Sequence, residues 1–205
     1  MTSTRTAEEL RADLMGGLAE SIAAKGYAAT TIADIVTHAR VSKRTFYEHF
    51  TDKEACLMAL YEQGCEHLLA VVRSAAGAGG RPWRDMVNSG VSAYLTALEG
   101  MPAVTRTLLV EIQAAGPKAF RLRQQTQRRF ADALVEAIDH ARSADPSIPT
   151  LTPLLATALV GGVHEMMLQV SDPYTGAGPS FTTLTPAVDA LVYAILTNPW
   201  QTRME

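Results

Sequence analysis

Apolar residues recur at helical spacing along most of this chain. Four of them follow one another at four-residue intervals near the N-terminus: Leu10, Leu14, Leu18 and Ile22. Residues at this spacing share one face of a helix. Thr6 and Glu9 form a capping-box pattern before them, and Gly26 supplies a stop after them. The pattern therefore predicts a first helix that begins after Thr6 and ends near residue 25.

Two shorter helical patterns follow, separated by about three residues. The apolar positions of the first pattern are Ile32, Ile35, Val36 and Ala39. Ser42 is an N-cap for the second pattern, which ends near Phe50. Thr51 and Glu54 form another capping-box pattern, which predicts the start of a long fourth helix.

Five further helical patterns occupy the rest of the chain, and we find no internal repeat. Segments rich in proline, glycine and alanine separate them. The predicted helices cover about residues 82–99, 101–114, 118–142, 151–170 and 186–197, with a flexible loop at 171–180. Runs of β-branched residues are short, so we expect an all-α fold of about nine helices.

Positive charge is concentrated in a short part of a chain that is mildly acidic as a whole. The formal net charge of −3 argues against nonspecific coating of nucleic acid. Within residues 38–53, however, four basic residues and two histidines accompany only two acids. A local patch of this kind can bind phosphate without making the whole protein adhesive.

The cysteines and the longest apolar run limit the classes of protein to which this chain can belong. Cys56 and Cys65 are nine residues apart on one predicted helix, about 13 Å along its axis, too far to form a disulfide. No CxxC or His/Cys cluster accompanies them, so we expect reduced thiols, no metal site and no cofactor. The apolar run at 151–163 contains a proline and is shorter than the roughly 20 residues of a membrane-spanning helix. We therefore expect a soluble cytoplasmic protein that does not enter a membrane.

The two short helical patterns have the dimensions of a helix-turn-helix. Their inner faces can pack on the first helix through Ile32, Ile35, Val36, Val41, Phe46 and Phe50. Cations and hydroxyls on the second pattern then face outward, where a short helix can enter the major groove, and the flanking helix starts can hold phosphate. The predicted DNA-binding residues are Thr31, Arg40, Ser42, Lys43, Arg44, Thr45, Tyr47, His49 and Lys53.

Each of these residues also has an interpretation without DNA. A Lys-Arg pair is usually a solvated helix face, Tyr47 could pack in the core, and Ser42 is first of all an N-cap. The flanking pattern favours DNA contact, although one sequence does not assign side chains to bases.

A resemblance to a known family lies in residues 26–55, which read GYAATTIADIVTHARVSKRTFYEHFTDKEA. This stretch resembles the DNA-binding module of the tetracycline-repressor (TetR) family of bacterial transcription regulators. The matching features are Gly26-Tyr27, Ile32 and Ile35, Ala39, Val41-Ser42, Tyr47, Phe50 and Lys53-Glu54. The resemblance implies a helix-turn-helix DNA-binding domain at 1–53 and a ligand-binding and dimerisation domain at 54–205.

One position departs from the family's pattern. Arg40 stands in the turn, where members usually carry glycine. If this position takes a left-handed backbone, a residue other than glycine costs about 1–2 kcal/mol. Arg40 could instead add a phosphate contact, and Phe46, where a leucine-like residue is usual, should still be core.

The resemblance also implies a homodimer on a double-stranded, palindromic operator. Two modules about 34–36 Å apart can meet successive turns of the major groove. The predicted helices at 151–170 and 186–197 are the best interface candidates. Gly161-Gly162 in the first of them costs about 1 kcal/mol per glycine relative to alanine, which close approach of another helix would offset.

A small-molecule effector of unknown identity would bind a mainly apolar pocket with a few polar anchors. The candidate lining residues are Met86, Tyr94, Leu108, Glu111, Phe120, Gln124, Gln127, Phe130, His164 and Met166. Each of these residues is more readily explained as ordinary core or surface than as a ligand contact. The basic run at 118–130 has two interpretations. It is a solvated helix face, or it lies near the acids of the first helix, complements their charge and transmits ligand occupancy.

The sequence thus predicts a transcription regulator, in its simplest form a repressor, that a small apolar effector releases from its operator. The first alternative is a DNA-binding regulator without an effector, acting constitutively or through a protein partner. An all-α enzyme is a remote alternative, because no HExxH, GxSxG, P-loop or paired-Cys motif occurs. The adjacent His164 and Glu165 point about 100° apart on a helix, so we expect no catalytic residues.

Overall fold

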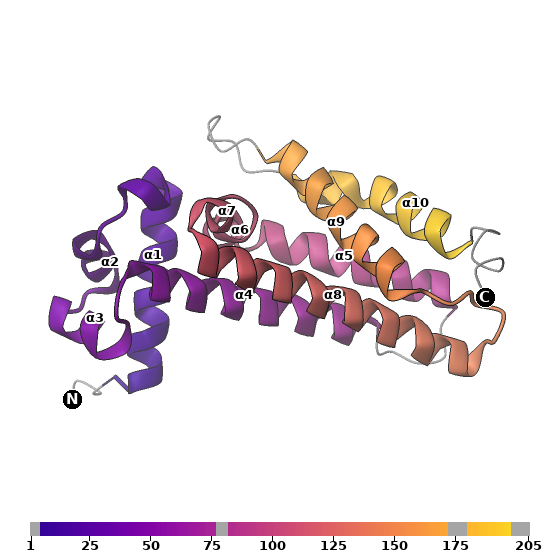
Figure 1. The fold of residues 1–205 in the computed structure, drawn as a ribbon, viewed down its shortest axis with the longest axis horizontal. Helices are drawn as coiled ribbons and strands as arrows, with labels where there is room; N and C mark the ends of the chain where they lie inside the picture. The colour runs from indigo at the N-terminus through magenta and orange to yellow at the C-terminus, as the bar shows by residue number, and fades with distance from the viewer. Residues whose placement is uncertain (1–4, 77–81, 172–179, 198–205) are drawn as a thin grey trace. The chain divides into compact units, whose positions relative to one another are not determined.

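The computed structural model describes residues 5–76, 82–171 and 180–197, and every regular element among them is a helix (Figure 1). These elements are α1 (Ala7–Ala29), α2 (Ile32–Ala39), α3 (Lys43–His49), α4 (Lys53–Ala76), α5 (Trp83–Glu99), α6 (Pro102–Arg106), the π-helix η1 (Thr107–Glu111), α7 (Ile112–Ala114), α8 (Pro117–Ala144), α9 (Pro153–Val170), the 3-10 helix η2 (Phe181–Leu184) and α10 (Thr185–Leu196). The predicted all-α class is confirmed. The predicted flexible loop at 171–180 falls mostly outside the described residues.

The start of α1 agrees with the sequence, and the helix breaks at the predicted Gly26 but continues to Ala29. The Thr6 hydroxyl accepts the Glu9 N–H at 3.2 Å, and the Glu9 carboxylate accepts the Thr6 N–H at 2.6 Å. Together these bonds satisfy two amides that have no partner inside the helix. At the other end Gly26 takes φ 78° and ψ 163°, a conformation open to glycine, and this breaks the helical path before the chain turns toward α2.

The predicted cap of α4 is wrong by one residue. Asp52, rather than the Thr51–Glu54 pair, caps the helix, because its Oδ1 accepts the Ala55 N–H at 2.7 Å. Aspartate is as good an N-cap as threonine, and its carboxylate is also favoured by the helix dipole. Glu54 is then free to approach Lys118 of α8 at 3.8 Å.

The helix predicted at 101–114 contains a π-helical turn. Segments α6, η1 and α7 follow one another without a break, and η1 spans Thr107–Glu111. A π-turn aligns residues that are five apart. Arg106 and Glu111 are five apart and form an ion pair at 3.1 Å.

Contacts within the chain group it into two compact units. The first consists of residues 1–65 and 101–123, and the second of residues 66–100 and 124–205. The predicted functional boundary between residues 53 and 54 does not coincide with this division. The assignment of DNA binding to 1–53 and of ligand binding and dimerisation to 54–205 stays a prediction.

The first unit has a core that joins its short helices to α1. In this unit α2 and α3 lie beside α1, at the indigo end of the chain (Figure 1). The core side chains come from α1, from the two short helices with their C-terminal flank and from α4: Leu14, Leu18, Ile22, Ile35, Phe46, Phe50 and Leu57. Most of the predicted inner-face residues are buried as expected, and Ile32 and Val41 are half-buried.

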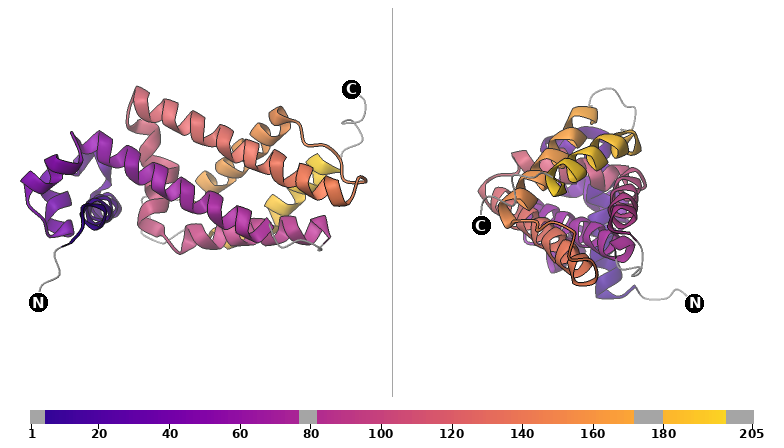
Figure 2. Two further views of the ribbon diagram at one scale, coloured as in Figure 1. Left: turned by 90° about the horizontal axis from the view of Figure 1, so that it is seen from below. Right: turned by 90° about the vertical axis from the view of Figure 1, so that its right-hand side faces the viewer.

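The second unit has its own core, built largely from α8, α9 and α10. Its buried members are Ala131, Ile138, Ile148, Leu151, Ala156, Leu159, Val188, Val192 and Leu196. Helices α9 and α10 pack beside each other in both views of Figure 2, and α10 also packs beside α5. Val188, Leu191, Val192 and Ile195 of α10 face this core.

Helices α1 and α2 approach each other closely at Gly17. A Cβ atom at this position would lie 2.5 Å from the Ile35 carbonyl oxygen and 3.0 Å from the Ala39 nitrogen. Both are backbone atoms of α2, so they cannot rotate away. The neighbouring Gly16 is exposed, and a Cβ there would meet no atom of the described chain within 4 Å.

We predict that Gly17→Ala lowers the free energy of unfolding by about 1–3 kcal/mol, because α1 and α2 must separate to accept one methyl group. The matched control Gly16→Ala should raise it by about 0.5–1 kcal/mol, through helix propensity alone. Urea unfolding followed by circular dichroism measures both. Equal effects of the two substitutions would contradict the close approach.

Candidate nucleic-acid interface

The turn between α2 and α3 is a Schellman motif with Arg40 in the left-handed position. The Val41 N–H donates to the Val36 carbonyl at 3.0 Å, and the Arg40 N–H donates to the Thr37 carbonyl at 3.3 Å. Arg40 has φ 54° and ψ 47°. The turn therefore takes the left-handed conformation, although a non-glycine residue in it is strained by about 1–2 kcal/mol.

Two aromatic anchors fix the orientation of α3. Phe46 is fully buried and Phe50, directly after the helix, is nearly so, with their ring centroids 5.8 Å apart. The Arg11 guanidinium of α1 lies 4.4 Å from the Phe50 ring centroid and also donates to the His49 carbonyl at 3.4 Å. These contacts hold one face of α3 against α1 and leave the opposite face in solvent.

The outward face of α3 presents the predicted DNA-binding cations. Lys43, Arg44 and Tyr47 are exposed, with 59% of Tyr47 accessible to solvent. Arg44 forms an ion pair with Glu48 at 3.0 Å on the same helix. Exposed pairs of this spacing contribute little to stability, so a phosphate or base edge can replace Glu48 at small cost.

The hydroxyl residues at the helix starts are used as caps. Ser42 accepts the Thr45 N–H at 3.0 Å, and its hydroxyl is 2.9 Å from that of Thr45. Thr31 caps α2 and donates to the Asp34 carboxylate at 2.6 Å. The Lys25 ammonium beside Asp34 holds the pKa of that carboxyl well below its usual range. Ser42 and Thr31 remain exposed, whereas Thr45 is half-buried.

Lys53 is committed to contacts inside the protein. Its ammonium donates to the carbonyls of Tyr27 at 2.8 Å and Thr30 at 2.7 Å, and lies 4.2 Å from the Tyr27 ring centroid. Burial lowers the pKa of Lys53 and raises that of Tyr27 to about 12. An ammonium has three N–H donors, so one remains for the predicted phosphate contact. Lys53 is therefore first an anchor that ties the start of α4 to the segment between α1 and α2.

Two arginines near the N-terminus have roles that the sequence pattern did not reveal. Arg11 stacks on Phe50, as described above. Arg5 donates to the carbonyl of Arg40 at 3.1 Å and pairs with Asp13 at 2.6 Å. The contacts of Arg11 with Phe50 and of Arg5 with Arg40 join residues more than thirty positions apart, and no local spacing rule predicts them.

The predicted ligand-lining residues divide between the two units. In the first unit Leu108 is buried, Phe120 is 51% exposed, and Glu111 pairs with Arg106 and accepts the Tyr27 N–H at 3.2 Å. In the second unit the rings of Tyr94 and Phe130 meet edge to face at 6.0 Å.

The remaining candidates lie in the second unit. Met86 and Met166 pack against its core, Gln124 is exposed, and Gln127 and His164 are half-buried. The structure thus brings some of the ten candidates into contact and not the whole set, and their role in ligand binding stays a prediction.

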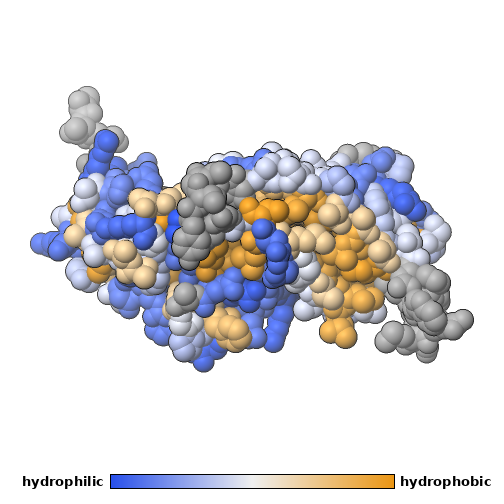
Figure 3. Space-filling model, turned by 90° about the horizontal axis from the view of Figure 1, so that it is seen from above, coloured by the Kyte–Doolittle hydropathy of each residue, from blue (hydrophilic) through white to orange (hydrophobic). Residues whose placement is uncertain are grey.

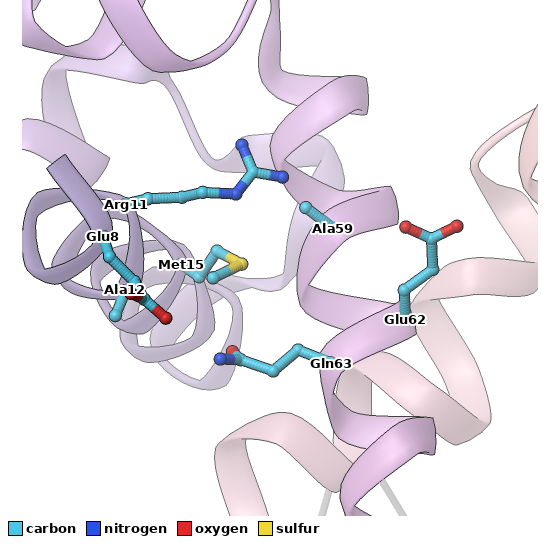
Figure 4. A pocket seen from close by; sticks show the side chains of 7 residues that line it. All are labelled: Glu8, Arg11, Ala12, Met15, Ala59, Glu62 and Gln63. Carbon is cyan, nitrogen blue, oxygen red and sulfur yellow. The ribbon is translucent and has the colours of Figure 1, made fainter.

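A hollow of about 310 Å³ lies between α1 and α4 in the first unit (Figure 4). Its lining residues are Glu8, Arg11, Ala12, Met15, Ala59, Glu62 and Gln63. None of the ten predicted ligand residues lines it. Two carboxylates and a guanidinium give it a polar rim, which differs from the mainly apolar site expected for the effector.

The basic run at 118–130 has partners outside the first helix. Lys118 approaches Glu54, and Arg129 forms an ion pair with Glu66. Three of the four acids of α1 are engaged elsewhere: Glu9 in its capping box, Asp13 with Arg5, and Glu20 with His38 at 2.9 Å. The ion pairs of the described residues therefore give no support to the hypothesis that this run pairs with the acids of α1.

Comparison with known proteins agrees with this geometry. The family of bacterial regulatory proteins named tetR matches residues 15–60, which include α2, α3 and most of α1. The uncharacterized HTH-type transcriptional regulator YxbF of Bacillus subtilis (strain 168) is 28% identical over 100 residues. That match spans 49% of this chain and only 25% of YxbF.

Solved structures extend the likeness over nearly the whole fold. A tetR-family regulatory protein from Rhodococcus RHA1 is 24% identical, with a TM-score of 0.64 over 92% of this chain and 98% of its own. FadR from Bacillus subtilis, in complex with stearoyl-CoA, is 15% identical, with a TM-score of 0.71 over 90% of this chain and 97% of its own. Residues 15–60 thus match the tetR family of bacterial regulatory proteins, and the chain shares the fold of solved tetR-family regulators; with the helix-turn-helix geometry above, these findings support a DNA-binding regulator of that family.

Proposed function

We propose that this protein is a cytoplasmic repressor that binds a palindromic operator as a homodimer and is released by a small apolar effector. The observation that carries the proposal is the division of α3 into two faces. Phe46 is buried against α1, while Lys43, Arg44 and Tyr47 stand together in solvent.

The outward face of α3 has the chemistry for reading a major groove. Arginine and lysine can donate to the O6 and N7 acceptors of guanine or to phosphate, and a tyrosine hydroxyl can donate to phosphate. Arg40, in the turn, and Thr31, at the start of α2, are exposed on the flanking segments. We assign them to the phosphate backbone on the two sides of the inserted helix.

A second copy of the chain is proposed to pack against α9 and α10 in the dimer. Helix α9 is long and apolar enough to cross a membrane by length and composition alone, yet only 17% of its residues are fully buried within the described chain. Leu154 is 78% exposed, and small residues at Ala158 and Gly161 are exposed on later turns of the same helix. Figure 3 shows broad hydrophobic patches on the side of the molecule where α9 and α10 lie in Figure 1.

The two glycines of α9 differ in their surroundings. A Cβ at Gly162 would lie 3.2 Å from Leu191, so packing on α10 accounts for this glycine. A Cβ at Gly161 would meet nothing within 4 Å in the described chain. Close approach by the partner's helix would account for Gly161.

The response to an effector would act through the last residues of α1, which follow the break at Gly26. The Tyr27 N–H donates to Glu111 of η1, and its carbonyl accepts from Lys53 of α4. This segment is therefore held from two sides within the first unit. A shift of η1 would move Glu111 and so change its hydrogen bond to the Tyr27 N–H. The position of α2, which follows in the chain, would then change as well.

An effector with an apolar part is consistent with the FadR structure, which is a complex with stearoyl-CoA, a long apolar acyl chain on a polar, charged CoA group. The alternative is a regulator without an effector. To distinguish them, we would measure operator affinity with stearoyl-CoA and a panel of small apolar compounds, all first confirmed to bind. The ligand-gated function predicts that at least one lowers affinity by about fivefold or more. Constant affinity across all confirmed binders would favour the alternative.

We predict that Lys43→Ala weakens binding to a duplex that the wild-type protein enriches from a random pool. Loss of one phosphate contact should also reduce the slope of log affinity against log salt by about 1 per subunit. Fluorescence anisotropy at several salt concentrations measures both quantities. Lys118→Ala removes the same charge outside the helix-turn-helix and should leave the slope unchanged. An unchanged slope in Lys43→Ala would exclude Lys43 from the phosphate contacts.

We predict that Gly161→Arg converts a dimer into a monomer in sedimentation velocity, because a long charged side chain keeps the two α9 helices apart. Gly161→Ala adds one methyl group and should retain most of the dimer. A dimer that persists with arginine would place the interface elsewhere, and a monomeric wild-type protein would contradict the homodimer itself.

A further inference from the structure

Arg5 precedes the first helix, yet its guanidinium reaches the helix-turn-helix turn. One terminal nitrogen donates to the Arg40 carbonyl at 3.1 Å. The other donates to the Asp13 carboxylate at 2.6 Å and, at the longer distance of 3.4 Å, to the Ala39 carbonyl. Asp13, on α1, therefore orients the guanidinium toward the end of α2.

The hydrogen bonds of the turn itself do not use the two carbonyls that Arg5 contacts. The Schellman bonds engage the carbonyls of Val36 and Thr37. The next carbonyls toward α3 include those of Ala39 and Arg40, at the negative end of the α2 dipole, where a cation is favoured. Arg5 supplies both a positive charge and donors in a fixed planar arrangement.

The same turn holds the only non-glycine residue with positive φ among the described residues, Arg40 at φ 54°. Glycine adopts this conformation without strain, whereas arginine needs other contacts to hold it there. The bond from Arg5 ends on the carbonyl of that strained residue.

We propose that Arg5, held by Asp13, is a positioning residue for DNA binding: it stabilises the left-handed conformation of Arg40 and thereby fixes the angle at which α3 leaves α2. This inference rests on the proposed role of α3 in DNA binding. Arg5 acts through the backbone of the turn and does not need to touch DNA.

The test is a double-mutant cycle in the full-length protein, with Arg5→Ala, Arg40→Gly and the two combined. Affinity is measured for a duplex that the wild-type protein enriches from a random pool, and thermal stability is measured without DNA. With arginine in the turn, Arg5→Ala should lower affinity by about fivefold or more and the melting temperature by about 2–4 °C. With glycine in the turn, the same substitution should change affinity by less than about twofold, because glycine needs no clamp.

The salt dependence separates positioning from direct contact. A positioning role predicts that Arg5→Ala leaves the salt slope of binding unchanged, whereas loss of a phosphate contact would reduce it. Asp13→Asn, which removes no cation, should reproduce the effect of Arg5→Ala in part and in the same direction.

Equal losses of affinity in the arginine and glycine backgrounds, or a reduced salt slope, would overturn the inference. Failure of the proposed function has a different signature. If the wild-type protein enriches no duplex, DNA binding fails, while the melting temperatures of the four proteins still report whether Arg5 and Arg40 are coupled.

Discussion

Burial of Phe46 and Phe50 against α1 is the interaction on which the functional surface depends. Successive residues of a helix point in different directions, so fixing these two aromatic side chains fixes where every other side chain of α3 points. Lys43, Arg44 and Tyr47 then share the solvent face, where the exposed Arg44–Glu48 ion pair adds little to hold them. The stability of the core thus determines the geometry of a surface that contributes little to stability.

The position of α3 depends in turn on the close packing of α1 and α2 and on the turn between α2 and α3. Gly17 permits the backbones to approach, and the left-handed Arg40 turns the chain sharply enough for α3 to return to α1. Arg5 and Arg11 reach from α1 and its N-terminal flank to the ends of α2 and α3. Glu111 accepts the Tyr27 N–H near the end of α1, and Lys53 donates to the carbonyl of Thr30, which follows that helix. The module is therefore held by charged groups on backbone carbonyls and amides as well as by its apolar core.

Local patterns in the sequence predicted most of the fold. Periodicity located the helices, and Phe46 and Phe50 were recognised as core because they lie on one face of a short helix. The cap of α4 was misplaced because Thr51 and Asp52 are both good caps and only the backbone decides between them. The π-turn at η1 was missed because its pairing of Arg106 with Glu111 has a spacing that ordinary helical periodicity does not contain. Arg5 and Lys53 acquire their partners only when distant segments meet, and residues that could line an effector site depend on side-chain packing between helices for the same reason.

The central claim is that the solvent face of α3 lies against DNA in the bound state. Photocrosslinking tests it most directly, with Tyr47 replaced by p-benzoylphenylalanine and, as a control, the exposed His67 of α4 replaced in the same way. In the complex with an enriched duplex, the account predicts a protein–DNA crosslink from position 47 and none from position 67. A bound complex that gives no crosslink from position 47, or gives it equally from position 67, would contradict the account.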